Sequence, residues 1–182
     1  MQRTRLNRGI ILIISYVLVL GLLIFIDQIT KIHFENKFNE SGNTDVISGF
    51  FYFTFTKNTG AAFSFLAKVS WGQAFFKVLT IVSLAVFVFL TILSHKKGYL
   101  FFTFALIITL SGTIGNFIDR MSLDYVRDFI GFIFGSYYFP IFNFADICLT
   151  VGVIMIVVHL LFLDDNAIFK KSNGSQDNSG RE

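Results

Sequence analysis

The sequence has few charged residues, and cysteine and proline occur once each. Only 15% of its 182 residues are charged, against about 25% in ordinary soluble domains. The single cysteine, Cys148, excludes an internal disulfide and a multi-cysteine metal site. The formal net charge of +3 is too small to indicate a nucleic-acid partner. These deficits argue against a water-soluble protein.

The sequence contains several long runs of uncharged, mostly apolar residues. Apolar residues make up 54% of the chain, and 25 residues are Phe. Four runs of 17 to 21 residues carry no formally charged side chain. At a rise of about 1.5 Å per residue, each can cross a hydrocarbon core about 30 Å thick. We therefore expect an all-α membrane protein, a bundle of four transmembrane helices at about 9–26, 76–94, 99–118 and 145–163.

Two apolar runs have alternative interpretations. The first follows Arg3, Arg5 and Arg8, as in a secretion signal, but it is longer than the usual apolar region of about 7–15 residues. We expect it to be retained as a span. The run 129–145 is also uncharged, yet glycines, a proline and tyrosines interrupt it. We interpret that run as an interfacial loop that does not cross.

The basic residues predict the orientation of the bundle. With four spans, the arginines before the first span, Lys96 and Lys97 between the second and third, and the lysines after the fourth all lie on one side. The positive-inside rule makes that side cytoplasmic, so both termini lie inside. The outer loops are then 27–75 and 119–144.

The outer loops and the tail complete the expected organisation. Residues 50–56 are rich in aromatic residues and threonine, which predicts a strand in a small extracytoplasmic sheet. We expect phenylalanines of that sheet to contact lipid headgroups. Residues 1–163 form one domain, and the polar tail 164–182 is expected to be a disordered cytoplasmic segment.

Polar and ionisable residues gather where the spans meet the outer loops. Such residues are costly near a membrane, so each one is a functional hypothesis. Asn116, Asp119 and Arg120 share one side of the third span, because they are three and four residues apart. Asn143 and Asp146 repeat the Asn-x-x-Asp spacing at the start of the fourth span.

Several of these residues have simple structural explanations. Asp119 next to Arg120 is most simply an ion pair or a helix terminator, and Asp124 a solvated loop residue. Asp27 can end the first span or pair with Lys31. The turn Asn58-Thr59-Gly60 can be an ordinary hairpin turn, or it can present Asn58 to a bound chain.

Asp128 and Asp146 are harder to explain structurally. Apolar residues flank both, and an unpaired charge there would be expensive. Two carboxylates held together share a proton, so that one can activate water while the other donates to a carbonyl oxygen. This is the chemistry of peptide hydrolysis without a covalent intermediate. His33, His95 and His159 lie too far apart along the predicted topology to supply a triad or a metal site. We expect Cys148 to be a small buried side chain.

Five segments in order resemble the lipoprotein signal peptidase (signal peptidase II) family of bacterial membrane aspartic peptidases. They are Asp27-Gln28-Ile29-Thr30-Lys31, Asn58-Thr59-Gly60-Ala61-Ala62-Phe63, Gly115-Asn116-Phe117-Ile118-Asp119-Arg120, Val126-Arg127-Asp128-Phe129 and Phe142-Asn143-Phe144-Ala145-Asp146. The resemblance implies that Asp128 and Asp146 are the catalytic pair. It implies supporting or substrate-binding roles for a further set: Asp27, Lys31, Asn58, Gly60, Asn116, Asp119, Arg120 and Asn143.

The resemblance also implies a substrate. The family cleaves prolipoproteins just before a cysteine that already carries a diacylglyceryl group. It implies a multi-pass protein of the bacterial cell membrane with its active site at the extracytoplasmic face. We expect membrane lipids as the surroundings, no metal or other cofactor, and a monomer. Asp124 stands where the family often has glycine.

Two other functions fit a polytopic protein with membrane carboxylates. A proton-coupled transporter would place ionisable groups through the whole depth of the bundle, whereas here they cluster at one face. A structural or assembly subunit would use the aromatic loop for docking, and substitutions at Asp128 and Asp146 would then be silent.

Overall fold

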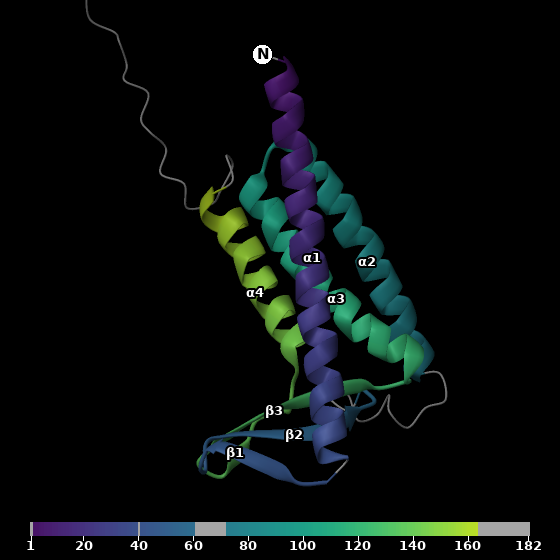
Figure 1. The fold of residues 1–182 in the computed structure, drawn as a ribbon, viewed down its shortest axis with the longest axis vertical. Helices are drawn as coiled ribbons and strands as arrows, with labels where there is room; N and C mark the ends of the chain where they lie inside the picture. Colours follow the sequence, from purple (N-terminus) through teal and green to yellow (C-terminus); the bar gives the residue numbers. More distant parts are fainter. Residues whose placement is uncertain (1, 40, 61–71, 164–182) are drawn as a thin grey trace, which may run out of the picture.

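A computed structural model describes residues 2–39, 41–60 and 72–163, with side chains from residue 9 onward, except that of Gln73. It contains four long helices that are apolar enough to cross a membrane, which confirms the predicted bundle (Figure 1). The expected tail 164–182 and the segment 61–63 lie outside the described residues. The helices are α1 (Gln2–Phe38), α2 (Gly72–Lys97), α3 (Leu100–Ser122) and α4 (Phe144–Val158), the last continued by a π-helical turn, η2 (His159–Leu163).

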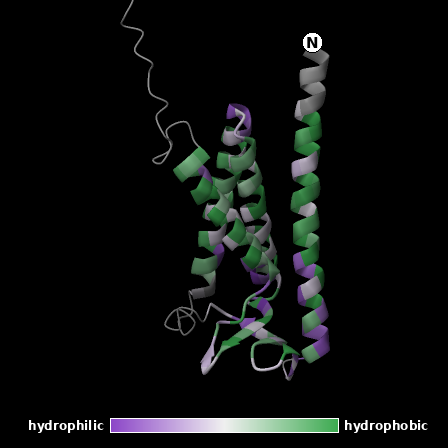
Figure 2. Ribbon diagram, turned by 90° about the vertical axis from the view of Figure 1, so that its left-hand side faces the viewer, coloured by the Kyte–Doolittle hydropathy of each residue, from purple (hydrophilic) through white to green (hydrophobic). Residues whose placement is uncertain are grey.

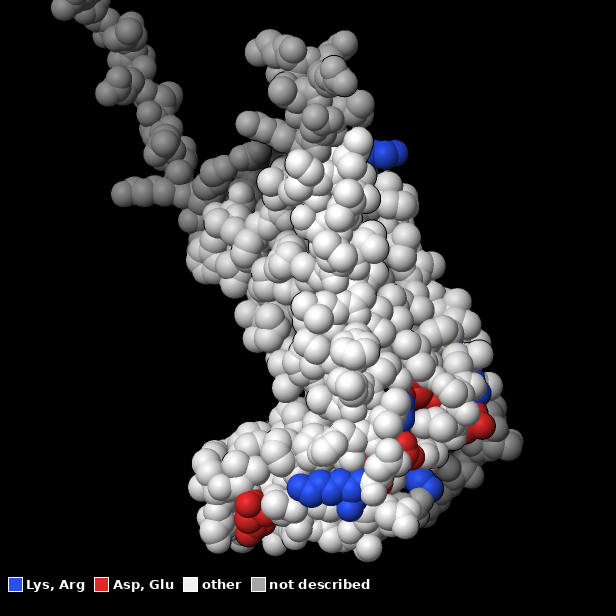
Figure 3. Space-filling view, viewed as in Figure 1, with Lys and Arg blue, Asp and Glu red and all other residues white. Residues whose placement is uncertain are grey.

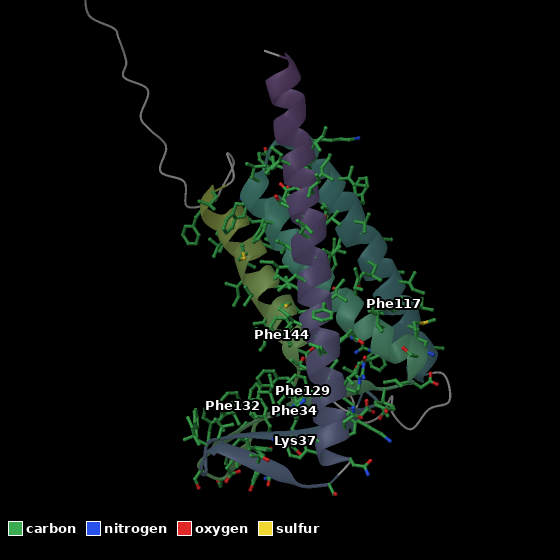
Figure 4. The ribbon with its side chains drawn as sticks, in the orientation of Figure 1. Phe34, Lys37, Phe117, Phe129, Phe132 and Phe144 are labelled. Atoms are coloured by element: carbon green, nitrogen blue, oxygen red, sulfur yellow. The ribbon has the colours of Figure 1, made fainter. Side chains whose placement is uncertain are left out.

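Helix α1 continues to Phe38, well past the end that the sequence predicted at residue 26. The loss of hydrophobicity after residue 26 ends the apolar run, but the helix persists because its polar residues find partners in the rest of the protein. Figure 2 shows this change, with hydrophobic colouring along most of α1 and hydrophilic colouring near its last turns. The last turns pack on the sheet, where the Phe34 ring stacks on those of Phe53 and Phe129 (Figure 4).

An antiparallel sheet lies at the end of the bundle where α1 ends, with strand order β1-β2-β3-β4. The strands are β1 (Asn43–Ile47), β2 (Phe51–Asn58), β3 (Val126–Phe134) and β4 (Tyr137–Tyr138). The strand predicted at 50–56 is β2. The uncharged run 129–145 is not one of the membrane-spanning helices, as predicted. Most of its first half belongs to strands β3 and β4, however, and is not a loop. Sequence analysis missed β3 because its residues are buried on both faces at first and therefore do not alternate.

Helix α3 is the centre of the bundle. In the apolar 18-residue stretch of α3, 61% is buried inside the protein, against 17% or less in the corresponding stretches of the other three helices. Gly115 allows the close approach of α1, since a Cβ there would lie 2.5 Å from Asp27 Oδ2. This small residue of α3 thus permits close helix packing. Figure 3 shows that the acidic side chains visible on that face gather toward the sheet end.

Candidate active site

The first turn of α4 is closed by a reciprocal capping box. Asn143 is the N-cap residue, and its side chain accepts a hydrogen bond from Asp146 N at 3.0 Å. The Asp146 carboxylate accepts in return from Asn143 N at 3.2 Å. This arrangement satisfies two backbone N–H groups at the helix start. The Asn-x-x-Asp spacing seen in the sequence is therefore the spacing of a helix cap, which fixes Asp146 in one place.

Asp128 reaches the same point from strand β3. Its carboxylate accepts hydrogen bonds from Asn143 Nδ2 at 2.6 Å and from Asn58 Nδ2 at 2.8 Å, and its side chain is buried. Asn143 therefore contacts both acidic residues, one through each end of its amide. The structure brings Asp128 and Asp146 together from separate segments of the chain.

Asn116 on α3 joins this pair to a buried lysine. It donates to Asp146 Oδ1 at 2.8 Å, and its own oxygen accepts from Asn143 Nδ2 at 3.1 Å and from Lys31 Nζ at 2.9 Å. Lys31 is fully buried and also contacts Asp27 at 2.9 Å and Asp119 at 3.4 Å. The pairing of Asp27 with Lys31 considered from the sequence is thus present.

The environment of Asp128 favours retention of a proton. Burial, and then the nearby charge of Asp146, raise the pKa of the Asp128 carboxyl to about 7. The hydrogen bonds from Asn58 and Asn143 act in the opposite direction, because they stabilise the charged carboxylate. At neutral pH the Asp128 carboxyl can therefore hold a proton, as the chemistry considered from the sequence requires of one member of the pair.

Asp119 forms its ion pairs differently from the sequence interpretation. Within the described residues they run to Lys31 and Arg127, and not to the adjacent Arg120. Arg127 donates to both carboxylate oxygens of Asp119, from Nη2 at 2.6 Å and from Nε at 3.2 Å. A helix separates the Asp119 and Arg120 side chains by about 100°, so neighbours in sequence need not meet.

Arg127 is the residue that sequence reasoning missed, although it lies inside one of the motif segments. Besides Asp119, it donates to Gln28 Oε1 at 3.0 Å and to Glu35 Oε2 at 3.2 Å. These contacts attach β3 to α1 and α3 on the side of the strand opposite Asp128. The one available signal was a cation directly before an aspartate in an otherwise apolar strand.

Asn58 combines the two roles that the sequence left open. Its side-chain oxygen accepts from Gly60 N at 2.9 Å, which closes a turn, while its nitrogen donates to Asp128. Gly60 has φ of +93°, a conformation that favours glycine. The turn therefore orients Asn58 toward the carboxylate.

Asp124 and Arg120 lie at the edges of the site. Asp124 is exposed, as predicted, and pairs with Lys77 at 2.6 Å. Its φ of +64° explains why glycine suits this position. Arg120 is half-buried, lies over the Phe76 ring and donates to the Asn116 carbonyl at 3.5 Å.

Two cavities meet at Asp146. One, of about 280 Å³, lies between α2, α3 and α4, and its polar lining includes Asn116 and Arg120. The other, of about 340 Å³, lies between α4 and the segment that precedes it, and is lined by Phe139, Phe142, Asp146, Ile147, Thr150 and Val151. A substrate can therefore approach this carboxylate from two sides.

A bundle of apolar spans that carries at one end two aspartates, both hydrogen-bonded to the same asparagine, defines a membrane aspartic peptidase. Residues 19–162 match the family profile described as "Signal peptidase (SPase) II". The chain belongs to this signal peptidase II family, and it is a multi-pass bacterial membrane protein.

Relatives and solved structures agree with this assignment. Proteins named lipoprotein signal peptidase from Listeria welshimeri and Enterococcus faecalis are each 38% identical to this chain. The match to the Listeria protein covers 82% of this chain and 94% of that protein. The match to the Enterococcus protein covers 90% of this chain and 98% of that protein. A solved structure described as a bacterial membrane enzyme, 34% identical, superposes with a TM-score of 0.71 over 81% of this chain and 92% of its own.

Proposed function

We propose that this protein removes the signal peptide from diacylglyceryl-modified prolipoproteins, cleaving just before the lipidated cysteine. Asp128 and Asp146 are the catalytic pair, and the nucleophile is water. The observation that carries the proposal is the double contact of Asn143, whose side chain bonds Asp128 and caps the helix at Asp146. Family membership supports the reaction class, and this contact supports the choice of residues.

The reaction uses one charged and one protonated carboxyl group. The charged group takes a proton from water as its oxygen attacks the scissile carbonyl carbon, while the protonated group donates to the carbonyl oxygen. As the tetrahedral intermediate collapses, the carboxyl that took a proton from water gives it to the leaving nitrogen, and a hydroxyl of the intermediate returns its proton to the other carboxylate. The raised pKa of Asp128, about 7, suits it to hold the shared proton at neutral pH.

The remaining polar residues hold or balance this pair. Asn58, Asn116 and Asn143 donate directly to the carboxylates. Lys31 acts through Asn116, and Asp27 and Asp119 neutralise Lys31 in the buried region. Arg120 lines the polar cavity beside Asp146, where a cation can orient substrate carbonyl groups.

The proposal includes an orientation in the membrane. Lys96 and Lys97 are the last residues of α2, at the end of the bundle opposite the sheet, and the positive-inside rule places that end in the cytoplasm. Both termini are then cytoplasmic, and the sheet and the aspartates lie at the extracytoplasmic face. The proposal takes the monomer as the active unit, and one chain supplies both aspartates and the asparagines that bond them.

The test compares single aspartate variants on one substrate in lipidated and unlipidated form. Asp128→Asn and Asp146→Asn should each lower cleavage of the lipidated prolipoprotein by about 10³-fold or more. The exposed Asp124→Asn is the matched control and should retain activity. All three proteins should be recovered from the membrane. Robust cleavage by either dyad variant, or equal cleavage of unlipidated substrate by the wild type, would contradict the proposal.

A further inference from the structure

A small cavity lies at the end of the bundle opposite the sheet, where α2 turns into α3 (Figure 1). Its volume is about 90 Å³, and it is lined by Leu90, Leu93, Ser94, Lys97, Tyr99 and Phe102. We propose that this cavity binds the phosphate of an anionic phospholipid from the surrounding membrane. The inference goes beyond the proposed cleavage reaction and does not depend on it, because the aspartates lie at the other end of the bundle.

The wall that α2 contributes changes from apolar to charged along the helix. Leu90, Ser94 and Lys97 follow one another at intervals of four and three residues, so they share one face of α2. Leu90 and Lys97 are roughly 10 Å apart along the helix axis, given the rise per residue of an α-helix. The leucine therefore lies within the span, and the lysine lies at its end. A phospholipid has the same order along the membrane normal, with acyl chains first and then the phosphate.

Lys97 and Tyr99 supply the polar groups that can bind a phosphate. Lys97 is exposed, and none of the ion pairs within the described residues includes it. Tyr99 uses its backbone for its hydrogen bonds to described residues, since its N–H donates to Ser94 O and its carbonyl accepts from Thr103 Oγ1. Its phenol hydroxyl is therefore available to a ligand. The Ser94 hydroxyl is already bonded to Thr91 O at 3.0 Å and to Thr103 Oγ1 at 2.9 Å.

The charges at this end of the bundle favour an anion. Helix α2 ends in two lysines, Lys96 and Lys97. The acidic residues that the structure describes lie toward the sheet end instead: Asp27, Glu35, Asp45, Asp119, Asp124, Asp128 and Asp146. On the face seen in Figure 3, no acidic side chain is visible at the end opposite the sheet. Basic pockets between membrane helices on the cytoplasmic side bind anionic headgroups, and the orientation proposed above places this cavity on that side.

The size of the cavity determines which part of the lipid enters it. Its volume of about 90 Å³ is roughly three times the ~30 Å³ that one water molecule occupies in the liquid. That space suits a phosphate group but not two acyl chains, so the chains lie outside. Helix α2 offers them an exposed apolar surface beside the cavity, formed by Phe89, Ile92 and Leu93. Chains anchored in the leaflet keep the phosphate concentrated at the depth of Lys97, an advantage that a free phosphate ion lacks.

The first experiment compares the two adjacent lysines. The full chain in dodecyl maltoside micelles is titrated with dioleoylphosphatidylglycerol, and native mass spectrometry measures the affinity for the first bound lipid. Lys97→Gln should weaken binding at least about tenfold, because it removes a charge-assisted hydrogen bond to the phosphate. Lys96→Gln removes the same charge from an exposed residue that does not line the cavity, so we expect less than about a threefold loss.

Two outcomes of that titration would overturn the proposal. Equal losses in Lys96→Gln and Lys97→Gln would show a diffuse attraction to the basic end of the bundle and no site in the cavity. Unchanged binding in Lys97→Gln would show that the lipid binds elsewhere. Asp128→Asn, which should not cleave, should bind the lipid as the wild type does, so this proposal and the proposed function fail separately.

The second experiment identifies the chemistry of the ligand. Thermal unfolding in detergent is measured with phosphatidylglycerol, with phosphatidylcholine of the same chains, and with inorganic phosphate at the same concentration. A ligand that binds the folded chain raises Tm. We expect phosphatidylglycerol to raise the Tm of the wild type but not that of Lys97→Gln, and the other two ligands to raise it less. An equal rise with phosphatidylcholine would indicate a site for acyl chains, and an equal rise with inorganic phosphate a site for the ion. Either result would overturn the assignment to an anionic lipid.

Discussion

The two ends of the bundle differ in whether their buried polar groups have ionic or hydrogen-bonding partners. At the sheet end, buried Asp27, Lys31 and Asp119 each have ionic partners, and the amides between them are bonded on both sides. At the other end, the Tyr16 hydroxyl and His95 Nδ1 have no hydrogen-bond partner among the described residues, although their rings are in edge contact at 5.7 Å. Among the described residues, packing and neutral hydrogen bonds such as that between Ser94 and Thr103 hold the second end, whereas the first is organised around specific charges.

This difference indicates where the sequence is constrained by chemistry. A buried network with every member bonded is rigid, and removal of one member leaves another charge unpaired. A polar atom without a partner tolerates replacement by an apolar group. Substitutions at the two ends should therefore have effects of different size and sign, and the four predictions that follow test this.

The largest effect is expected when Arg127 is replaced by Met. Asp119 would lose its bidentate partner, and loss of one member of a buried ion pair typically costs about 3–5 kcal/mol. Thr103→Val is the control at the other end of the bundle. It removes two neutral hydrogen bonds of the Thr103 hydroxyl, one with Ser94 Oγ and one to the Tyr99 carbonyl, and about 1 kcal/mol is typical for each. Thermal unfolding in detergent measures both, and equal shifts in Tm would contradict the comparison.

Arg127→Lys separates charge from geometry within the same network. Lysine keeps the positive charge but cannot donate two parallel hydrogen bonds to Asp119. Because β3 carries Asp128 as the next residue, we expect kcat to fall while Tm changes less than in Arg127→Met. An Arg127→Lys protein with unchanged kcat would show that charge alone is sufficient at this position.

A change in pH dependence is expected when Asn58 is replaced by Ala. The pKa of Asp128 is about 7, and loss of its proton above that pH should reduce activity. The hydrogen bond from Asn58 lowers this pKa, so its removal raises the pKa further, and the alkaline limb of the kcat profile should move to higher pH. Lys57→Ala, on the preceding and exposed residue, is the control. A shift toward lower pH in Asn58→Ala would contradict this assignment.

The sequence predicts the spans and the pair of aspartates better than it predicts the residues and contacts that hold the aspartates in place. Runs without charge locate helices, because lipid excludes charges along the whole length of a span. The rule does not predict the end of α1, because Asp27 and Lys31 continue the helix and neutralise each other inside the protein. The sequence does not predict that Arg127 pairs with Asp119 either, because Arg127 comes from a strand whose position depends on tertiary packing.

The smallest effects are expected at the unpaired hydroxyl of Tyr16. Its ring packs against Ile107 and Leu110, and Tyr16→Phe keeps that packing. An unbonded buried hydroxyl costs about 1–3 kcal/mol, so its removal should leave Tm unchanged or raise it slightly. Tyr16→Ala, which also removes the ring, is the comparison and should lower Tm. A lower Tm in Tyr16→Phe would show that the hydroxyl has a bonding partner, and the contrast between the two ends of the bundle would then lie in their charges alone.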